Sequence, residues 1–163
     1  MSKKLLKLKT VFFDQGLMIR GSESVIEGVS LRRATVIPDQ RGRLGEIMRA
    51  DDPRFEKFGQ VYFTSTYPGV VKAWHFHKLQ TDNFYVIKGL LKIGLYDERQ
   101  GSQTKGEVNE IYLGEQHGWM CVRSEEAFIL NVVSEMYNYQ QPDEYRTDPH
   151  DNHIPYDWAR KDG

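Results

Sequence analysis

The sequence of 163 residues lacks most features that mark specialised protein classes. It has one cysteine, Cys121, which excludes an intrachain disulfide and a cysteine-rich zinc site. No run approaches the roughly 18 apolar residues of a membrane-spanning helix, and the basic start lacks the apolar segment of a secretory signal. The 22 basic and 23 acidic side chains nearly cancel, which argues against a general nucleic-acid-binding protein. We therefore expect a soluble, cytoplasmic protein that contacts neither nucleic acid nor membrane.

The length predicts one domain, residues 27–163, preceded by an N-terminal extension at residues 1–26. The extension mixes basic residues, a short apolar run, glycine and serine, which fits an extra strand, a disordered arm or a segment exchanged between two copies of the chain. The polar C-terminal tail ends in Tyr156 and Trp158, and these two aromatic residues predict that it docks on the body.

Short apolar runs separated by turn residues predict an all-β protein. Alternation is clearest at Leu91, Ile93 and Leu95, and strands at roughly 8–12-residue spacing favour a sandwich or barrel. The turn at Lys88-Gly89 predicts a hairpin or bulge. One short segment, Asp52–Phe58, is helix-like. The expected strands are residues 31–37, 46–49, 61–67, 71–77, 84–88, 90–96, 108–113, 118–122 and 127–133.

The strongest local motif is Gly69-x5-His75-x-His77-x4-Asp82-x6-Gly89. In a strand His75 and His77 share one face, and with Asp82 they have the ligand set of a divalent metal site. The spacing resembles the first motif of the cupin superfamily, with Asp82 where glutamate is usual. That superfamily takes a third histidine ligand from a second motif, and the surroundings of His117 do not match it. A metal-binding cupin that uses His75, His77 and Asp82 is therefore the alternative prediction.

A second resemblance covers residues 27 to 158. The ordered set of segments resembles the dTDP-4-dehydrorhamnose 3,5-epimerase family. These segments are Asp39-x-Arg41-Gly42-x-Leu44-x-Glu46, Pro68-Gly69 to His77, Val86 to Gly89, Tyr96 to Arg99, Ser102-x-Thr104-x-Gly106, His117-Gly118-Trp119, Tyr137 to Glu144 and Ile154 to Trp158.

The resemblance implies an all-β cupin jelly roll, a double-stranded β-barrel with few short helices, that is usually a homodimer. It implies a nucleotide-linked 4-keto-6-deoxy sugar as substrate and no cofactor. The ketone acidifies the neighbouring C–H bonds, a histidine base removes such a proton, a cation holds the enolate, and a tyrosine returns the proton to the opposite face.

Carried over residue by residue, His75 matches the base and His117 the second active-site histidine. Lys72 matches a pyrophosphate-binding arginine, while Arg41 and Glu46 match nucleotide-contacting positions that are often supplied across the dimer. A regular strand would turn Lys72 away from His75, so only a bulge would bring both to one ligand. The resemblance thus predicts catalytic and substrate-binding residues at His75, Asp82, His117, Arg41, Glu46, Lys72, His77, Tyr85 and Tyr137.

The sequence departs from the family at two catalytic positions. Asp82 stands where the family has its enolate-stabilising lysine, and Leu130 or a neighbour stands where it has its tyrosine. The segment between Leu113 and His117 is short, so either one strand is missing or His117 is not the equivalent residue.

These departures leave several outcomes open. Tyr85, Tyr137, Tyr139 or water would supply the acid; the reaction would be a single epimerisation or a keto-isomerisation; Asp82 would pair with a histidine; or the protein would only bind nucleotide sugars.

Overall fold

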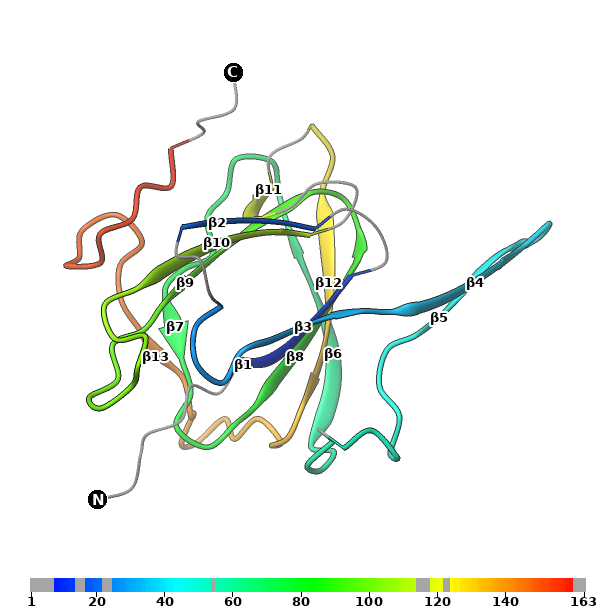
Figure 1. The fold of residues 1–163 in the computed structure, drawn as a ribbon, viewed down its shortest axis with the longest axis horizontal. Coiled ribbons are helices and arrows are strands. Elements are labelled where there is room, and N and C mark those ends of the chain that lie inside the picture. The colour runs from blue at the N-terminus through cyan, green and yellow to red at the C-terminus, as the bar shows by residue number, and fades with distance from the viewer. Residues whose placement is uncertain are drawn as a thin grey trace.

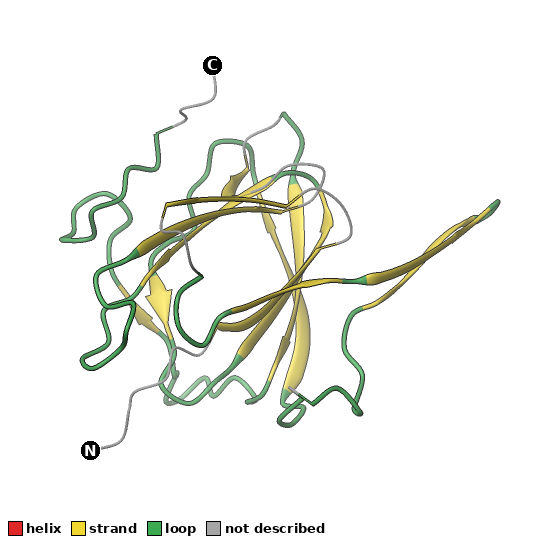
Figure 2. Ribbon diagram, in the orientation of Figure 1, coloured by secondary structure: helices red, strands yellow, loops and turns green. Residues whose placement is uncertain are grey.

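The computed structural model is an all-β protein (Figure 1), as expected. It describes residues 8–13, 17–21, 25–53, 55–113, 118–121 and 124–159. These residues contain no helix (Figure 2), so the expectation of a few short helices is wrong for this part of the chain. At the segment proposed as helical, the N–H of Phe55 donates to the carbonyl of Asp52 at 2.8 Å, and such a single turn is too short to sustain a helix.

Two sheets make up the body, and neither closes into a barrel. The five-stranded sheet has the order β3-β1-β8-β12-β6, and the four-stranded sheet has the order β11-β9-β10-β2. Two pairs, β13-β7 and β4-β5, complete the fold. The strands are β1 (Leu8–Phe13), β2 (Leu17–Gly21), β3 (Ser30–Arg33), β4 (Thr35–Asp39), β5 (Gly42–Glu46), β6 (Gln60–Thr66), β7 (His75–Phe76), β8 (Asp82–Lys88), β9 (Leu91–Tyr96), β10 (Val108–Leu113), β11 (Gly118–Cys121), β12 (Ala127–Val133) and β13 (Tyr145–Arg146).

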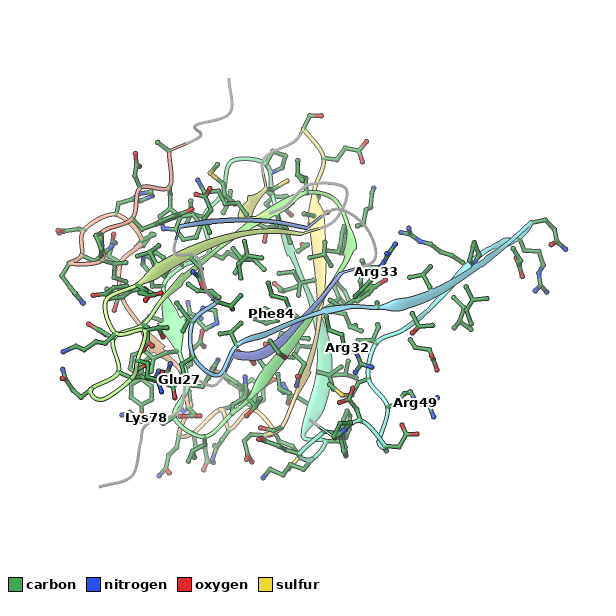
Figure 3. The ribbon with its side chains drawn as sticks, in the orientation of Figure 1. Glu27, Arg32, Arg33, Arg49, Lys78 and Phe84 are labelled. Carbon is green, nitrogen blue, oxygen red and sulfur yellow. The ribbon has the colours of Figure 1, made fainter. Side chains whose placement is uncertain are left out.

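The main core lies between the two sheets. Alternate residues of β8 and β12, among them Phe84 and Ile129, turn inward and meet Leu91, Ile93 and Ile111 of the facing sheet. Phe84 lies in this interior in Figure 3. These five side chains are at most 4% exposed, so they supply much of the hydrophobic stabilisation of the body.

Several strand predictions are confirmed and others are corrected. The strands at 108–113 and 127–133 have the expected bounds, whereas the one at 31–37 is divided between β3 and β4. The run 71–77 keeps only two strand residues, and 46–49 keeps only Glu46.

The turn at Gly89 is a corner between layers, because β8 and β9 belong to different sheets. The expected hairpin is therefore wrong, whereas the alternative of a bulge fits the register shift between β8 and β12 beside Lys88. Gly89 has φ +87°, and a Cβ there would lie 2.8 Å from the Cα of Ala127, so glycine is required by both conformation and space.

The two ends of the chain take part in the fold. Strand β1 pairs with β3 and β8, and β2 pairs with β10, so described parts of residues 1–26 belong to the main sheets. The boundary at residue 26 stays a prediction. The indole of Trp158 is 3% exposed and packs beside Leu90 and Met120, which confirms that the tail docks on the body.

Strands β4 and β5 form a two-stranded arm, residues 35–46, that projects away from the body (Figure 1). Ile37 and Leu44 are directly opposite each other in the register, so their side chains share one face. They are 58% and 59% exposed, which gives the arm an apolar face that the single chain does not cover.

The described residues contain no helix long and apolar enough to cross a membrane.

Candidate active site

His75 and His77 line a cavity whose wall also includes Phe84 of one sheet and Ile93 of the other. The chain before them is not a regular strand, because Val71 forms only an isolated bridge with Met120 and continuous pairing is limited to His75 and Phe76, with β13. This irregular backbone brings Lys72, His75 and His77 to one cavity of about 120 Å³, which a regular strand would not do. The two imidazole rings meet edge to face, with their centroids 5.5 Å apart.

Asp82 is the carboxylate of the cluster and is 4% exposed. It begins β8 on the same inward face as Phe84, so it lies where the apolar core gives way to polar groups. The amides of Gln80 and Asn131 donate to its Oδ1 at 2.8 and 3.0 Å. Its Oδ2 lies 3.5 Å from Nε2 of His77. These partners offset much of the cost of burying the negative charge.

The orientation of His77 is fixed by Asp143. Nδ1 of His77 contacts the carbonyl oxygen of Asp143, and because a carbonyl only accepts, Nδ1 carries a proton and Nε2 faces Asp82. The carboxylate of Asp143 accepts the backbone N–H groups of Lys78, Leu79 and Gln80 at 3.0, 2.7 and 2.9 Å. Burial raises the pKa of Asp143, but these hydrogen bonds outweigh it, and the net pKa is lowered. Asp143 therefore holds the loop that carries both His77 and Gln80.

His75 is half-buried, and its environment favours the neutral imidazole. Burial lowers the pKa of His75 below its usual value, and the neighbouring His77 adds to this, while the charge of Asp82 opposes it. A neutral imidazole is the form that accepts a proton. At neutral pH, His75 is therefore in the protonation state that a general base needs.

Part of the cavity wall is aromatic. Trp74 and Trp158 pack with their ring centroids 5.1 Å apart, and both line the cavity. A Cβ at Gly94 would lie 2.8 Å from the Trp74 ring and 3.1 Å from that of Trp158, so only glycine lets the two indoles pack this closely against β9. Within the described residues, neither buried indole N–H has an acceptor.

Tyr62 brings a phenol to the far side of Asp82. It pairs with Asn131 in the register of β6 and β12, and the Asn131 amide donates to its hydroxyl at 2.8 Å. Burial and the negative charge of Asp82 raise the pKa of Tyr62 to about 12, although the hydrogen bond from Asn131 opposes this. The phenol is therefore protonated across the physiological pH range.

The structure brings together some of the expected residues and separates others. Tyr85 lies on the outer face of the five-stranded sheet, packed with Ala34 and Leu130, so it does not face the cavity. Tyr137 packs edge to face on Tyr139, and neither lines the cavity.

The arm and one histidine remain apart from the cavity. Arg41 and Glu46 belong to the arm, where Arg41 pairs with Asp39 at 2.5 Å and Glu46 pairs with Arg49 at 3.1 Å. His117 lies outside the described residues.

A larger cleft of about 860 Å³ lies beyond Trp158. Val71, Met120 and His150 contribute to its lining, and none of the clustered groups at His75 does. Trp158 lines both hollows, so its indole lies between the small cavity and the cleft. We place the chemistry in the smaller hollow, because the titratable groups converge there.

Sequence reasoning missed four residues of the cluster: Tyr62, Gln80, Asn131 and Asp143. One signal was available for Asn131, because it lies between Ile129 and Val133 on the inward face of an apolar strand. A polar residue at such a position is buried and needs partners.

Two curated proteins are similar to this chain over most of its length. The chain is 37% identical over 146 residues to the probable low-salt glycan biosynthesis epimerase Agl13 of Haloferax volcanii, covering 81% of this chain and 89% of that protein. It is 34% identical over 146 residues to the spore coat polysaccharide biosynthesis protein SpsL of Bacillus subtilis, covering 82% and 97%.

One solved structure has a similar fold over nearly the whole of both chains. The crystal structure of a dTDP sugar isomerase from Desulfovibrio desulfuricans G20 superposes with a TM-score of 0.71 at 25% identity, covering 91% of this chain and 94% of that one. The resemblance to the sugar-epimerase type of cupin is thereby confirmed. The family described as the polysaccharide biosynthesis C-terminal domain matches residues 37–145, and the chain belongs to it.

Proposed function

We propose that this protein is a nucleotide-sugar epimerase that inverts a carbon next to the 4-keto group of a nucleotide-linked 4-keto-6-deoxy sugar, with His75 as the general base. The observation that carries this is the neutral imidazole of His75 at a cavity that also holds Lys72 and Asp82. The relatives support the class of reaction, since one is named a glycan biosynthesis epimerase and another a dTDP sugar isomerase.

The cavity offers groups for each part of the reaction. The aromatic wall of Trp74 and Trp158 suits the apolar face of a sugar ring. His75 removes the proton, and the electron pair moves to the ketone oxygen to form an enolate. Lys72 is the cation that lines the same cavity, and its ammonium donates to Thr64 Oγ1 at 3.0 Å. The same ammonium contacts the carbonyl oxygen of Ser65, and we propose that it offsets the developing negative charge.

Solvent-deuterium exchange tests this function. In D2O, the purified protein is incubated with dTDP- and UDP-linked 4-keto-6-deoxyglucose, and deuterium in the sugar is followed by mass spectrometry and NMR. We expect exchange at a carbon next to the ketone together with appearance of the epimer. Absence of exchange with every nucleotide ketosugar offered would overturn the assignment.

We also propose that the active form is a homodimer in which the arm of one chain contacts the other. Arg41 and Glu46, expected to contact the nucleotide, lie on an arm that projects away from the body of their own chain. A second copy would cover the apolar pair Ile37 and Leu44 and bring those two residues toward its own site.

Replacing Ile37 and Leu44 together by aspartate is expected to give a monomer at low micromolar concentration. Two charges on the apolar face of the arm would be desolvated in the interface without partners. Light scattering coupled to gel filtration measures the mass of each form. The matched control is Tyr139→Asp, because Tyr139 is 88% exposed and lies off the arm. A monomeric wild-type protein, or a dimeric double variant, would contradict this interface.

The metal-binding alternative keeps one supporting observation. One ligand atom from each of His75, His77 and Asp82 lies within 4.8 Å of the others, which fits a site with two histidines and one carboxylate. A divalent ion held there would polarise the ketone of a bound sugar.

Elemental analysis of protein purified without chelators separates the two functions. The metal-free epimerase predicts less than about 0.1 equivalent of any transition metal. A stoichiometric metal that disappears in His77→Ala would instead establish the alternative.

A further inference from the structure

We propose that Tyr62 is the proton donor that completes the inversion, delivering its phenolic proton to the face of the sugar opposite His75. This inference rests on the proposed epimerase function. It concerns a residue of an edge strand, β6, which the motifs of the sequence do not mark.

The geometry consists of one continuous polar chain. The amide of Asn131 bridges the hydroxyl of Tyr62 at 2.8 Å and Oδ1 of Asp82 at 3.0 Å. Oδ2 of Asp82 lies 3.5 Å from His77, whose ring contacts that of His75. The phenol and the base therefore stand at the two ends of this chain, with the buried carboxylate between them. Inversion requires an acid and a base on two sides of one carbon.

The phenol is in the state that a donor needs. Its oxygen accepts the hydrogen bond from Asn131, and among the described residues its own proton has no acceptor. Asn131 is 1% exposed and fixed by three partners in all, so the phenol is held in place by a rigid neighbour. The high pKa of Tyr62 keeps the proton on the oxygen until a stronger base, such as an enolate carbon, takes it.

Tyr62 is joined to the cluster through Asn131 and is not itself among the residues that line the small cavity. Two other tyrosines are positioned differently. Tyr85 faces the outer side of the sheet. Tyr96 lines the cavity, and its ring centroid lies 6.2 Å from that of His153. In the described part of the molecule, no hydrogen bond joins Tyr96 to the polar chain. Tyr96 is therefore the competing donor that the experiment must separate from Tyr62.

The step balances as follows. His75 takes the proton as the C–H bond breaks, and the electron pair forms the enolate C=C bond with the negative charge on oxygen. The enolate carbon then takes the proton of Tyr62, which forms the new C–H bond on the other face and leaves a phenolate. Water reprotonates the phenolate, and His75 releases its proton to water, so no oxidant or reductant is needed.

The test compares two readouts in D2O. The first is deuterium incorporation with retention of configuration at the reacting carbon, and the second is formation of the epimer. For Tyr62→Phe we expect exchange within about 10-fold of wild type, because His75 still removes and returns the proton on its own face. Epimer formation should fall by about 10²-fold or more, which is the usual range for loss of a general acid. The melting temperature should stay within about 2 °C of wild type, because one partly exposed hydroxyl is lost.

Three control arms complete the experiment. Tyr139→Phe, on an 88% exposed ring, should change neither readout. Normal inversion by Tyr62→Phe, equal loss of both readouts, or loss of inversion in Tyr96→Phe in its place would each overturn the role of Tyr62. A wild-type protein without exchange would overturn the epimerase function and this role with it.

Discussion

Replacing His75 by asparagine is expected to lower solvent-deuterium exchange into a nucleotide-linked 4-ketosugar by about 10³-fold or more, together with epimer formation. The amide keeps the approximate size and polarity of the ring, but it has no basic nitrogen for the proton. General-base removal contributes typically about 10²–10⁴-fold. Both readouts should therefore fall in parallel, in contrast to the split expected for the proton donor.

Two measurements test whether the loss in His75→Asn comes from the missing base. His153→Gln removes an exposed imidazole that pairs with Glu98, and it should leave both rates within about twofold of wild type. Binding of the nucleotide ketosugar to His75→Asn, followed by calorimetry, should stay within about tenfold of wild type, because the base acts on the reacting carbon. Retention of more than a tenth of wild-type exchange by His75→Asn would show that another group is the base.

The second large effect is expected on stability, at the turn that joins β9 and β10. Asp97 is 0% exposed and accepts hydrogen bonds from Arg99 at 2.7 and 2.8 Å, from Ser102 at 2.6 Å and from Thr104 at 2.7 Å. Asp97→Asn leaves the Arg99 guanidinium, whose side chain is 12% exposed, without its counter-charge. Such a change costs about 3–5 kcal/mol, which for a chain of this size lowers the melting temperature by roughly 6–20 °C.

The pH dependence of this effect has a definite sign. Burial raises the pKa of Asp97, but the hydrogen bonds from Arg99, Ser102 and Thr104 outweigh it and hold the pKa well below the usual range. The charged carboxylate therefore stabilises the fold above about pH 4, and this contribution is lost as the pH falls below that value.

Thermal unfolding from pH 7 to pH 2 checks this prediction. The difference between wild type and Asp97→Asn should be largest at neutral pH and shrink in acid. The matched control is Asp51→Asn, since Asp51 pairs with Arg49 at 2.8 Å but is 69% exposed. That variant should melt with the wild-type protein. A difference for Asp97→Asn that stays constant down to pH 2 would contradict the assignment.

Much of the fold follows from local patterns, because alternation at period two identifies strands without knowledge of their partners. The runs at 108–113 and 127–133 illustrate this. The run at 71–77 fails because most of it finds no neighbouring strand, although its composition suits one. The arm was not predicted, for a related reason. The turn before Gly42 marks a break in the sequence, but only the pairing of β4 with β5 shows that the two strands project from the body together.

The residues of the candidate site also fall into two groups, those that local sequence indicates and those that only the assembled fold brings together. Spacing alone indicates His75, His77 and Asp82, since they are close in sequence. Tyr62 and Asn131 are 69 residues apart, and Asp143 is 65 residues from the loop that it holds, so these contacts depend on the assembled sheets. The resemblance places a tyrosine at Leu130 or a neighbour, whereas in the structure that neighbour, Asn131, pairs in register with Tyr62 of the adjacent strand.

Gly94 has a practical consequence for work in solution. By admitting both indoles against β9, it places two of the three tryptophans of the chain at the wall of the small cavity. Indole emission responds to local polarity, so the molecule carries its own optical reporter at the place where sugar would displace water. Fluorescence titration can follow occupancy without any attached dye.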